Sequence, residues 1–161
     1  MRIRSATISD WPAIWAIVEP MIRAGETYTL PRDLDEHAAH KYWMAPEHRV
    51  FVSELEDGGL GGTYYLRTNQ RGGGGHVCNC GYVTAPDLHG RGIARAMAEH
   101  SFETARALGY RAMQFNFVVS TNQRAVELWR RLGFDIVGTL PTAFCHPKLG
   151  YVDAFVMWKS V

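Results

Sequence analysis

The chain has 161 residues, enough for one domain that buries roughly two-thirds of its unfolded surface. Apolar residues make up 47% of it and charged residues 20%, as in ordinary globular proteins. A net charge of +1 argues against binding to nucleic acid or to an anionic membrane, and no apolar run reaches the ~20 residues of a membrane span. We therefore expect one cytoplasmic domain over residues 1–161, without a signal peptide.

The first third of the chain predicts one strand followed by two helices. Arg2–Ala6 alternates as a short strand, and Ser9 or Asp10 is a candidate cap for a helix that ends near Gly25. A second helix begins at residue 33 or 35 and ends near residue 44. The polar and aromatic loop 25–31 between the helices either overhangs a pocket or simply connects them.

The middle of the chain predicts a hairpin and a strand that leads into a long helix. Residues 49–55 and 61–66 alternate as strands on either side of Asp57-Gly58-Gly59, a typical hairpin turn. A glycine-rich loop follows over residues 68–75. The strand predicted over residues 76–84 is followed by a helix from about residue 93 to Gly109, whose apolar residues recur at helical spacing.

The last third predicts three more strands and a short helix. Residues 110–119 form a long apolar strand, which makes the preceding segment a right-handed strand–helix–strand unit. A helix over residues 122–132 ends at Gly133, and two strands over residues 134–140 and 151–159 are joined by a loop at 141–150. The pattern predicts an α/β (α+β) fold with about seven strands and about four helices.

A glycine-containing turn joins the strand at 76–84 to the helix that follows. In His89-Gly90-Arg91-Gly92-Ile93-Ala94, successive backbone N–H groups at a helix N-terminus could bind a phosphate or pyrophosphate. Arg95 stands where G-x-G-x-x-G needs a small residue, and no G-K-[ST] follows, so neither common nucleotide motif is present. A plain strand-to-helix turn is the alternative interpretation.

The three cysteines do not predict a disulfide framework or a metal site. Cys78, Cys80 and Cys145 are odd in number. The spacing H-x-C-x-C at residues 76–80 is too close for a zinc knuckle, which places two or more residues between its ligands. We interpret these cysteines as small buried apolar residues and expect no metal.

Two segments together resemble the GCN5-related N-acetyltransferase (GNAT) family. Residues 89–94 are similar to its acyl-CoA pyrophosphate loop, [QR]-x-x-G-x-[GA], with His89 in place of Gln or Arg. Asn122 to Phe134 is similar to its N-x-x-A-x-x-[LF]-[YW]-x-x-x-G-F segment. The resemblance implies the GNAT fold, in which a mixed sheet is splayed between its fourth and fifth strands, and acetyl-CoA as co-substrate. It assigns the cofactor to Tyr82, Val83, Thr84, His89, Gly90, Arg91, Gly92, Ile93, Ala94, Asn122 and Trp129.

Trp129 departs from the family at a position that bears on the chemistry. Many relatives have a tyrosine there that protonates the departing thiolate, whereas an indole N–H donates a hydrogen bond but transfers no proton. Either coenzyme A leaves as a thiolate, which a thiol pKa near ~8.5 permits, or another residue acts.

Asn79 and Asn116 are polar residues within otherwise apolar strands. Each needs a partner, because an unpaired buried amide costs ~1–3 kcal/mol. They either bond to each other or to backbone inside the sheet, or flank the splay and bind substrate. The runs around them are similar to fungal proline-analogue acetyltransferases, which act on azetidine-2-carboxylate. In that group the paired asparagines are functional, and the resemblance carries this role to Asn79 and Asn116.

The sequence thus predicts an N-acetyltransferase in which a small amine, such as an amino acid or proline-like imino acid, attacks the thioester directly. Asn116, Asn79 and Glu26 are the candidate catalytic residues, with Glu26 or a water as base, and Tyr28, Asn79, Asn116 and His146 the candidate substrate-binding residues. A peptide or protein N-terminal acetyltransferase and a non-catalytic acyl-CoA-binding module remain alternatives. A lid made by loops 25–31 and 141–150 would favour a small acceptor. A homodimer is one possible assembly.

Overall fold

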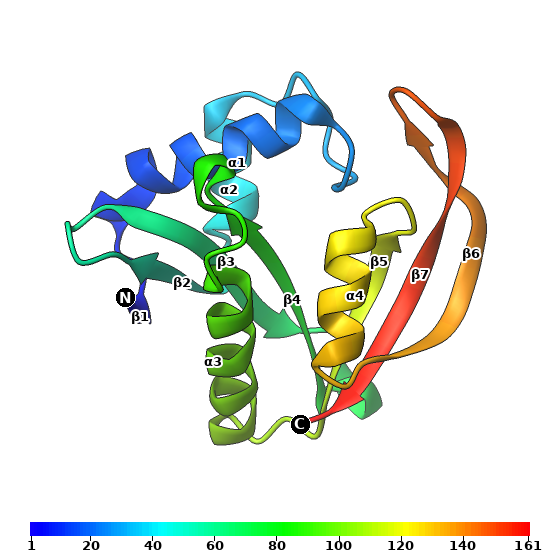
Figure 1. Ribbon diagram of the computed structural model, residues 1–161. Helices are drawn as coiled ribbons and strands as arrows, with labels where there is room; N and C mark the ends of the chain where they lie inside the picture. Colours follow the sequence, from blue (N-terminus) through cyan, green and yellow to red (C-terminus); the bar gives the residue numbers. More distant parts are fainter.

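A seven-stranded mixed sheet forms the centre of the computed structural model, which describes all 161 residues (Figure 1). Its strand order is β1-β2-β3-β4-β5-β7-β6. The strands are β1 (Arg2–Ser5), β2 (Arg49–Glu54), β3 (Leu60–Thr68), β4 (Val77–Thr84), β5 (Ala112–Val119), β6 (Asp135–His146) and β7 (Gly150–Ser160). Only the β4–β5 pair is parallel, and the others are antiparallel. This architecture confirms the predicted fold class.

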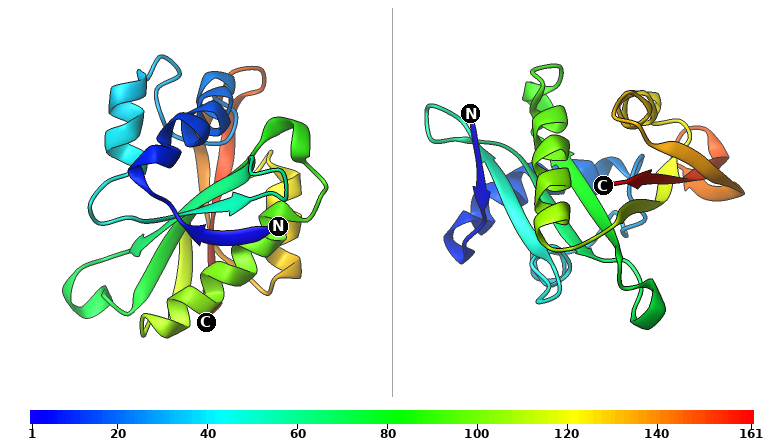
Figure 2. Two further views of the ribbon diagram at one scale, coloured as in Figure 1. Left: turned by 90° about the vertical axis from the view of Figure 1, so that its left-hand side faces the viewer. Right: turned by 90° about the horizontal axis from the view of Figure 1, so that it is seen from below.

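Four helices cover the two faces of the sheet (Figures 1 and 2). They are α1 (Trp11–Ala24), α2 (Glu36–Trp43), α3 (Ile93–Ala107) and α4 (Gln123–Arg131). Apolar residues of α1 and α2 pack with Val50, Val52 and Tyr65 on one face. Residues of α3 and α4 pack with Tyr64 and Leu66 on the other. None of the helices has the length and apolar character needed to cross a membrane.

The start of α1 differs from the prediction in one detail. Asp10 directly precedes the helix but makes no capping bond to it. Its carboxylate accepts the Thr7 N–H at 2.7 Å and pairs with Arg4, so it fixes a 3₁₀ turn over Ile8–Asp10 instead. The prediction for the second helix is confirmed, because Asp35 accepts the Ala38 N–H at 2.8 Å.

The parallel strands β4 and β5 are paired only at their beginnings. Val77 pairs with Ala112 and Cys78 with Met113, after which the strands diverge, so the predicted splay is present (Figure 1). The carbonyl of Val77 accepts the Asn69 N–H on the β3 side. Backbone direction alternates along a strand, so the N–H and C=O groups of Cys80, Tyr82 and Thr84 face the gap left by β5. A strand edge is thereby left unpaired inside the protein.

The predicted loop at 141–150 is wrong over most of its length. Strand β6 continues to His146, and the turn to β7 occupies only residues 147–149. Pro141 is accommodated because β6 is an edge strand and the register shifts between Leu140 and Phe144. Thr142, with φ 49°, lies in this bulge, and its N–H donates to Asp153. The long hairpin of β6 and β7 is therefore a regular element rather than a loop.

Candidate active site

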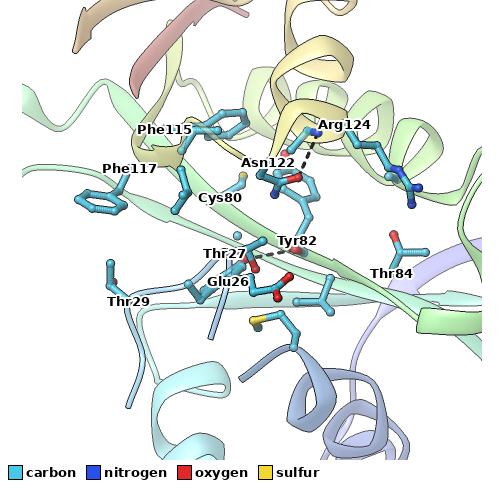
Figure 3. Close-up of a pocket in the computed structure, with 18 of the residues that line it drawn as sticks. Glu26, Thr27, Thr29, Cys80, Tyr82, Thr84, Phe115, Phe117, Asn122 and Arg124 are labelled. Atoms are coloured by element: carbon cyan, nitrogen blue, oxygen red, sulfur yellow. Dashed lines mark hydrogen bonds between the residues drawn. The ribbon is translucent and has the colours of Figure 1, made fainter. Parts of the chain in front are cut away.

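A cavity of about 680 Å³ lies between the diverging strands. It is lined by residues of β3, β4 and β5, of α1, the loop after it and α2, and of α4 (Figure 3). Its lining changes along its length. We call the part near His89 and Ala94 the loop end, and the part near Arg67, Asn79 and Asn116 the polar end.

The loop end consists mainly of backbone. Gly90 and Gly92 have φ angles of 81° and 79°, which side-chain-bearing residues rarely adopt, and no atom lies within 4 Å of a Cβ added at either. Helix α3 begins immediately afterwards, at Ile93. His89 and Ala94 line the cavity, whereas Gly90, Arg91, Gly92 and Ile93 do not, and the Ile93 side chain is buried in the core. An anion here would meet the N–H groups and the positive end of a helix.

The unpaired edge of β4 forms one wall of the cavity, to which Tyr82, Val83 and Thr84 contribute. The phenol of Tyr28, from the loop after α1, donates to the carbonyl oxygen of Tyr82 at 3.2 Å. Burial raises the pKa of Tyr28, so its hydroxyl stays protonated and able to donate. Gly81 permits this approach, because a Cβ there would lie 2.8 Å from the Tyr28 hydroxyl and 2.7 Å from Tyr65 Cζ.

Helix α4 closes the cavity from the other side. Asn122 lines it and also caps the helix, since its Oδ1 accepts the Ala125 N–H at 3.3 Å. Trp129 is buried, with ring centroids 5.0 Å from Tyr82 and 4.8 Å from Phe115. Its indole N–H makes no hydrogen bond within the chain. The contacts of Trp129 are therefore packing contacts.

The two asparagines line the polar end but are not bonded to each other. Asn79 donates from Nδ2 to the carbonyl oxygen of Gln114 at 2.8 Å, so it bridges β4 and β5 just beyond their last paired residues. Asn116 donates to Asn69 Oδ1 at 2.7 Å and accepts from Gln114 Nε2 at 2.9 Å. No hydrogen bond within the chain uses the Oδ1 of Asn79, which leaves one acceptor free.

Glu26 lies at the cavity and His146 does not. Glu26 Oε1 accepts from Lys148 Nζ at 2.8 Å, which joins the loop after α1 to the β6–β7 turn. That hydrogen bond and the lysine charge lower the pKa of Glu26, which makes it a weaker base than a free carboxylate. His146 is buried outside the cavity lining, where its Nδ1 accepts the N–H groups of Lys148 and Leu149 in the turn.

Of the cysteines, only Cys80 lines the cavity. Burial raises the pKa of its thiol, which keeps it protonated and poorly nucleophilic. Cys78 is buried in the core and Cys145 is exposed on β6. Nowhere do three or more His, Cys, Asp or Glu side chains gather closely enough to bind a metal.

Sequence reasoning missed three side chains at the polar end: Tyr42, Tyr65 and Arg67. The two tyrosine hydroxyls are 3.2 Å apart. Tyr65 and Arg67 alternate onto one face of β3, and Arg67 lies directly opposite Asn79 in the antiparallel register. The available signal was a charged residue two positions after a tyrosine in an apolar strand. Its position opposite Asn79 follows only from the pairing of the strands.

Comparison with known proteins agrees with this geometry. The sequence matches the acetyltransferase (GNAT) family over residues 11–134. It is 39% identical to a GCN5-related N-acetyltransferase from Kribbella flavida, with a TM-score of 0.95 and coverage of 99% of this chain and 97% of that one. A phosphinothricin acetyltransferase from Sinorhizobium meliloti, solved with acetyl-CoA, has the same fold at 19% identity, with a TM-score of 0.85 and coverage of 99% and 88%.

A curated relative is similar over only part of its length. N-acetyltransferase aca1 of Schizosaccharomyces pombe is 33% identical over 96 residues, which are 59% of this chain and 46% of the relative. The match thus spans less than half of that protein. The family match, by contrast, extends from the first helix to the end of the α4 segment, including both motifs that were read from the sequence. The chain therefore belongs to the acetyltransferase (GNAT) family.

Proposed function

We propose that the protein transfers an acetyl group from acetyl-CoA to the nitrogen of a small amine, namely an amino acid or a proline-like imino acid. The observation that supports this most directly is the unpaired edge of β4. It lies along a cavity of about 680 Å³ that reaches from the N-terminus of α3 to a cluster of polar side chains. A thioester with a long polar arm and a phosphate end fits a cavity in which a helix N-terminus, a free strand edge and polar side chains follow one another.

The residues fit acetyl-CoA at both of its ends. The N–H groups of residues 90–93 would bind the pyrophosphate, since both glycines leave the backbone open to a ligand. The N–H of Tyr82 and the N–H and C=O of Thr84 would bind the pantetheine arm as an added strand would be bound, while the Tyr82 carbonyl keeps the Tyr28 hydroxyl. Bound acetyl-CoA supplies the acetyl thioester. The same strand edge offers N–H groups that could stabilise negative charge on the thioester oxygen during attack.

The acceptor would occupy the polar end, among Tyr28, Asn79 and Asn116. The sequence resemblance to proline-analogue acetyltransferases favours an imino acid, and the aca1 relative is itself named an N-acetyltransferase. Because its pKa is lowered, Glu26 is too weak a base to deprotonate an ammonium group, so the amine would have to bind in its neutral form. The proton that the nitrogen loses after attack would pass to Glu26 or to water. Trp129 would pack against the thioester end and transfer no proton.

A screen of amines with acetyl-CoA, followed by release of free thiol, tests the proposal. The panel should contain the amino acids, azetidine-2-carboxylate, simple amines and peptides with free N-termini. We expect turnover with small acceptors. Turnover with peptides alone would identify an N-terminal acetyltransferase, and coenzyme A binding without thiol release for any amine would identify a non-catalytic module. Either result would overturn the proposal.

A further inference from the structure

Arg67 is an unpaired cation at the polar end of the cavity. It forms no salt bridge and donates no side-chain hydrogen bond to any residue of the chain, and its Nε is buried without a partner. A guanidinium carries five N–H donors and is charged at every physiological pH. Buried polar groups in proteins are nearly always satisfied, so an unsatisfied one beside a cavity requires an explanation.

No carboxylate forms a salt bridge with Arg67, and Glu47 is the acidic residue whose charge reaches the same His48 ring. The charge of its guanidinium reaches His48 and Tyr65, and burial lowers the pKa of His48 with Arg67 adding to that effect. His48 Nδ1 bonds to the carbonyl of Trp43, 3.0 Å away, and its ring stacks on Tyr65 with centroids 4.1 Å apart. These neighbours are neutral rings and hydroxyls. They can hold Arg67 in place but cannot balance its charge.

Glu26 is the single acidic residue that lines the cavity, and Lys148 already neutralises it. The other arginine of the lining, Arg124, is exposed on α4, two residues after Asn122. Among the residues that line the cavity, the positive charge of Arg67 is therefore offset by no free carboxylate. An anionic group of a bound molecule would supply the missing countercharge and accept hydrogen bonds from the terminal Nη groups, which, unlike Nε, are not buried.

We propose that Arg67 binds the carboxylate of the acceptor, so that the enzyme selects amines that carry a carboxylate over the same amines without one. This assignment rests on the proposed function and narrows its substrate class. Arg67 lies opposite Asn79, beside the point where β4 leaves β5. A carboxylate there would place the amine of a short amino or imino acid farther along the gap, toward the edge of β4. The planar fork of arginine matches a carboxylate in two parallel hydrogen bonds.

Arg67→Met tests the assignment, because methionine keeps much of the apolar stem and removes the charge. Calorimetry in the presence of coenzyme A should compare each amino acid, and L-azetidine-2-carboxylate, with its carboxamide. We expect the wild-type protein to bind its best carboxylate ~10- to 100-fold more tightly than the carboxamide, the scale of a charge-assisted pair. Arg67→Met should abolish that preference, while Arg71→Met, an exposed control in the loop after β3, should retain it.

Thermal unfolding separates binding from structure. Arg67 has no partner to lose, so Arg67→Met should unfold at the same temperature as the wild type or higher. If that variant does not fold, Arg67→Lys keeps the charge without the fork and should retain only part of the preference. A wild-type protein without carboxylate preference, or a folded Arg67→Met variant that keeps it, would overturn the assignment.

The assignment and the proposed function fail in different ways. Thiol release that is equally fast with carboxylates and carboxamides would overturn the role of Arg67 alone. The absence of thiol release with every amine would overturn the proposed function. Binding of a carboxylate that depends on Arg67 would still support the site in that case, because calorimetry does not require turnover.

Discussion

The two ends of the cavity differ in which groups of the chain form their surfaces. At the loop end the functional surface is backbone: two glycines at positive φ, the first N–H groups of α3 and the free edge of β4. At the polar end it is side chains from four separate segments, represented by Tyr28, Arg67, Asn79 and Asn116. A backbone surface depends on chain conformation and tolerates many side chains. A side-chain surface depends on which residues the fold brings together.

This difference is consistent with donor binding at the loop end and acceptor binding at the polar end. The loop end would bind the part of the donor that every acetylation shares, so it can be assembled from one continuous segment. The polar end would bind the acceptor, which differs between enzymes, so it is assembled from residues that can change independently. Substitutions at one end should then affect donor affinity, and substitutions at the other should affect acceptor turnover.

Gly92→Glu should give the largest effect and act on the donor alone. The new side chain would be strained at φ 79° and would bring a negative charge to the proposed pyrophosphate site. Like charges in contact cost several kcal/mol, so coenzyme A affinity measured by calorimetry should fall by more than ~10²-fold. Gly109→Glu is the matched control, with φ 83° and equally open surroundings at the other end of α3. Unchanged affinity in a folded Gly92→Glu variant would remove the basis for the donor site.

The same contrast explains how much could be predicted from sequence. The loop end was readable because Gly90, Gly92 and the start of α3 are consecutive, and their turn is determined locally. The order of strands and helices followed from their periodicity, whereas the splay followed only from the resemblance to the family. The loop predicted at 141–150 failed because Pro141 and Gly150 suggested turns, whereas an edge strand tolerates proline at a bulge.

The polar end was only partly readable. Asn79 and Asn116 stood out as polar residues in apolar strands, but their hydrogen-bond partners could not be found from the sequence. Asn116 bonds to Asn69, 47 positions away, in a contact that depends on the arrangement of β3, β4 and β5. Arg67 was overlooked for the same reason, since its lack of a partner is visible only when all neighbouring elements are in place.

Asn116→Ala should show the next largest effect, on acceptor turnover. If Asn116 binds substrate or the thioester oxygen, kcat/KM should fall by ~10²-fold, as for one lost donor to a developing charge, while coenzyme A affinity changes little. Asn69→Ala is a sharp control because it removes the same 2.7 Å hydrogen bond from a residue that does not line the cavity. It should lower turnover by less than ~10-fold.

Stability measurements on this pair distinguish the two roles of Asn116. Asn116→Ala removes two partly buried hydrogen bonds, to Asn69 and from Gln114, whereas Asn69→Ala removes one. The free energy of unfolding should therefore fall by about 2 kcal/mol in Asn116→Ala and by about 1 kcal/mol in Asn69→Ala. Losses of stability in this two-to-one proportion, combined with near-normal turnover in both variants, would show that Asn116 only holds β5 to the end of β3. The proline-like substrate would then lose its main support.

Trp129→Phe should have a smaller effect, on stability more than on activity. Trp129 packs against Tyr82, Phe115 and Phe134, and its indole N–H has no partner in the chain. The smaller ring should cost about 1–2 kcal/mol in urea unfolding through a packing defect. Turnover should stay within ~10-fold of the wild type, below the ~10²-fold loss expected when a true acid is removed. A loss above that limit in a stable variant would give the indole N–H a role in catalysis.

The smallest expected effect concerns the ion pair between Glu26, in the loop after α1, and Lys148, in the β6–β7 turn. Lys148 lowers the pKa of Glu26, so the pair stabilises the folded state above the ordinary pKa of glutamate, ~4.3, and this contribution is lost as the pH falls through the lowered value. Lys148→Met should therefore raise the pKa of Glu26 toward ~4.3 in a carboxyl NMR titration, whereas Lys41→Met on α2 should not.

Thermal unfolding should show how much the Glu26–Lys148 pair contributes to the stability of the whole protein. Both partners are solvent-accessible, so Lys148→Met should lower the unfolding temperature only slightly at neutral pH, and high salt or acid should remove the difference. Coenzyme A affinity should not change, because the pair lies away from the loop end. An unaltered pKa of Glu26 in Lys148→Met would mean that the loop after α1 and the β6–β7 turn are not joined in solution. The cavity would then be less enclosed beside Glu26, and a peptide as well as a small acceptor could enter it.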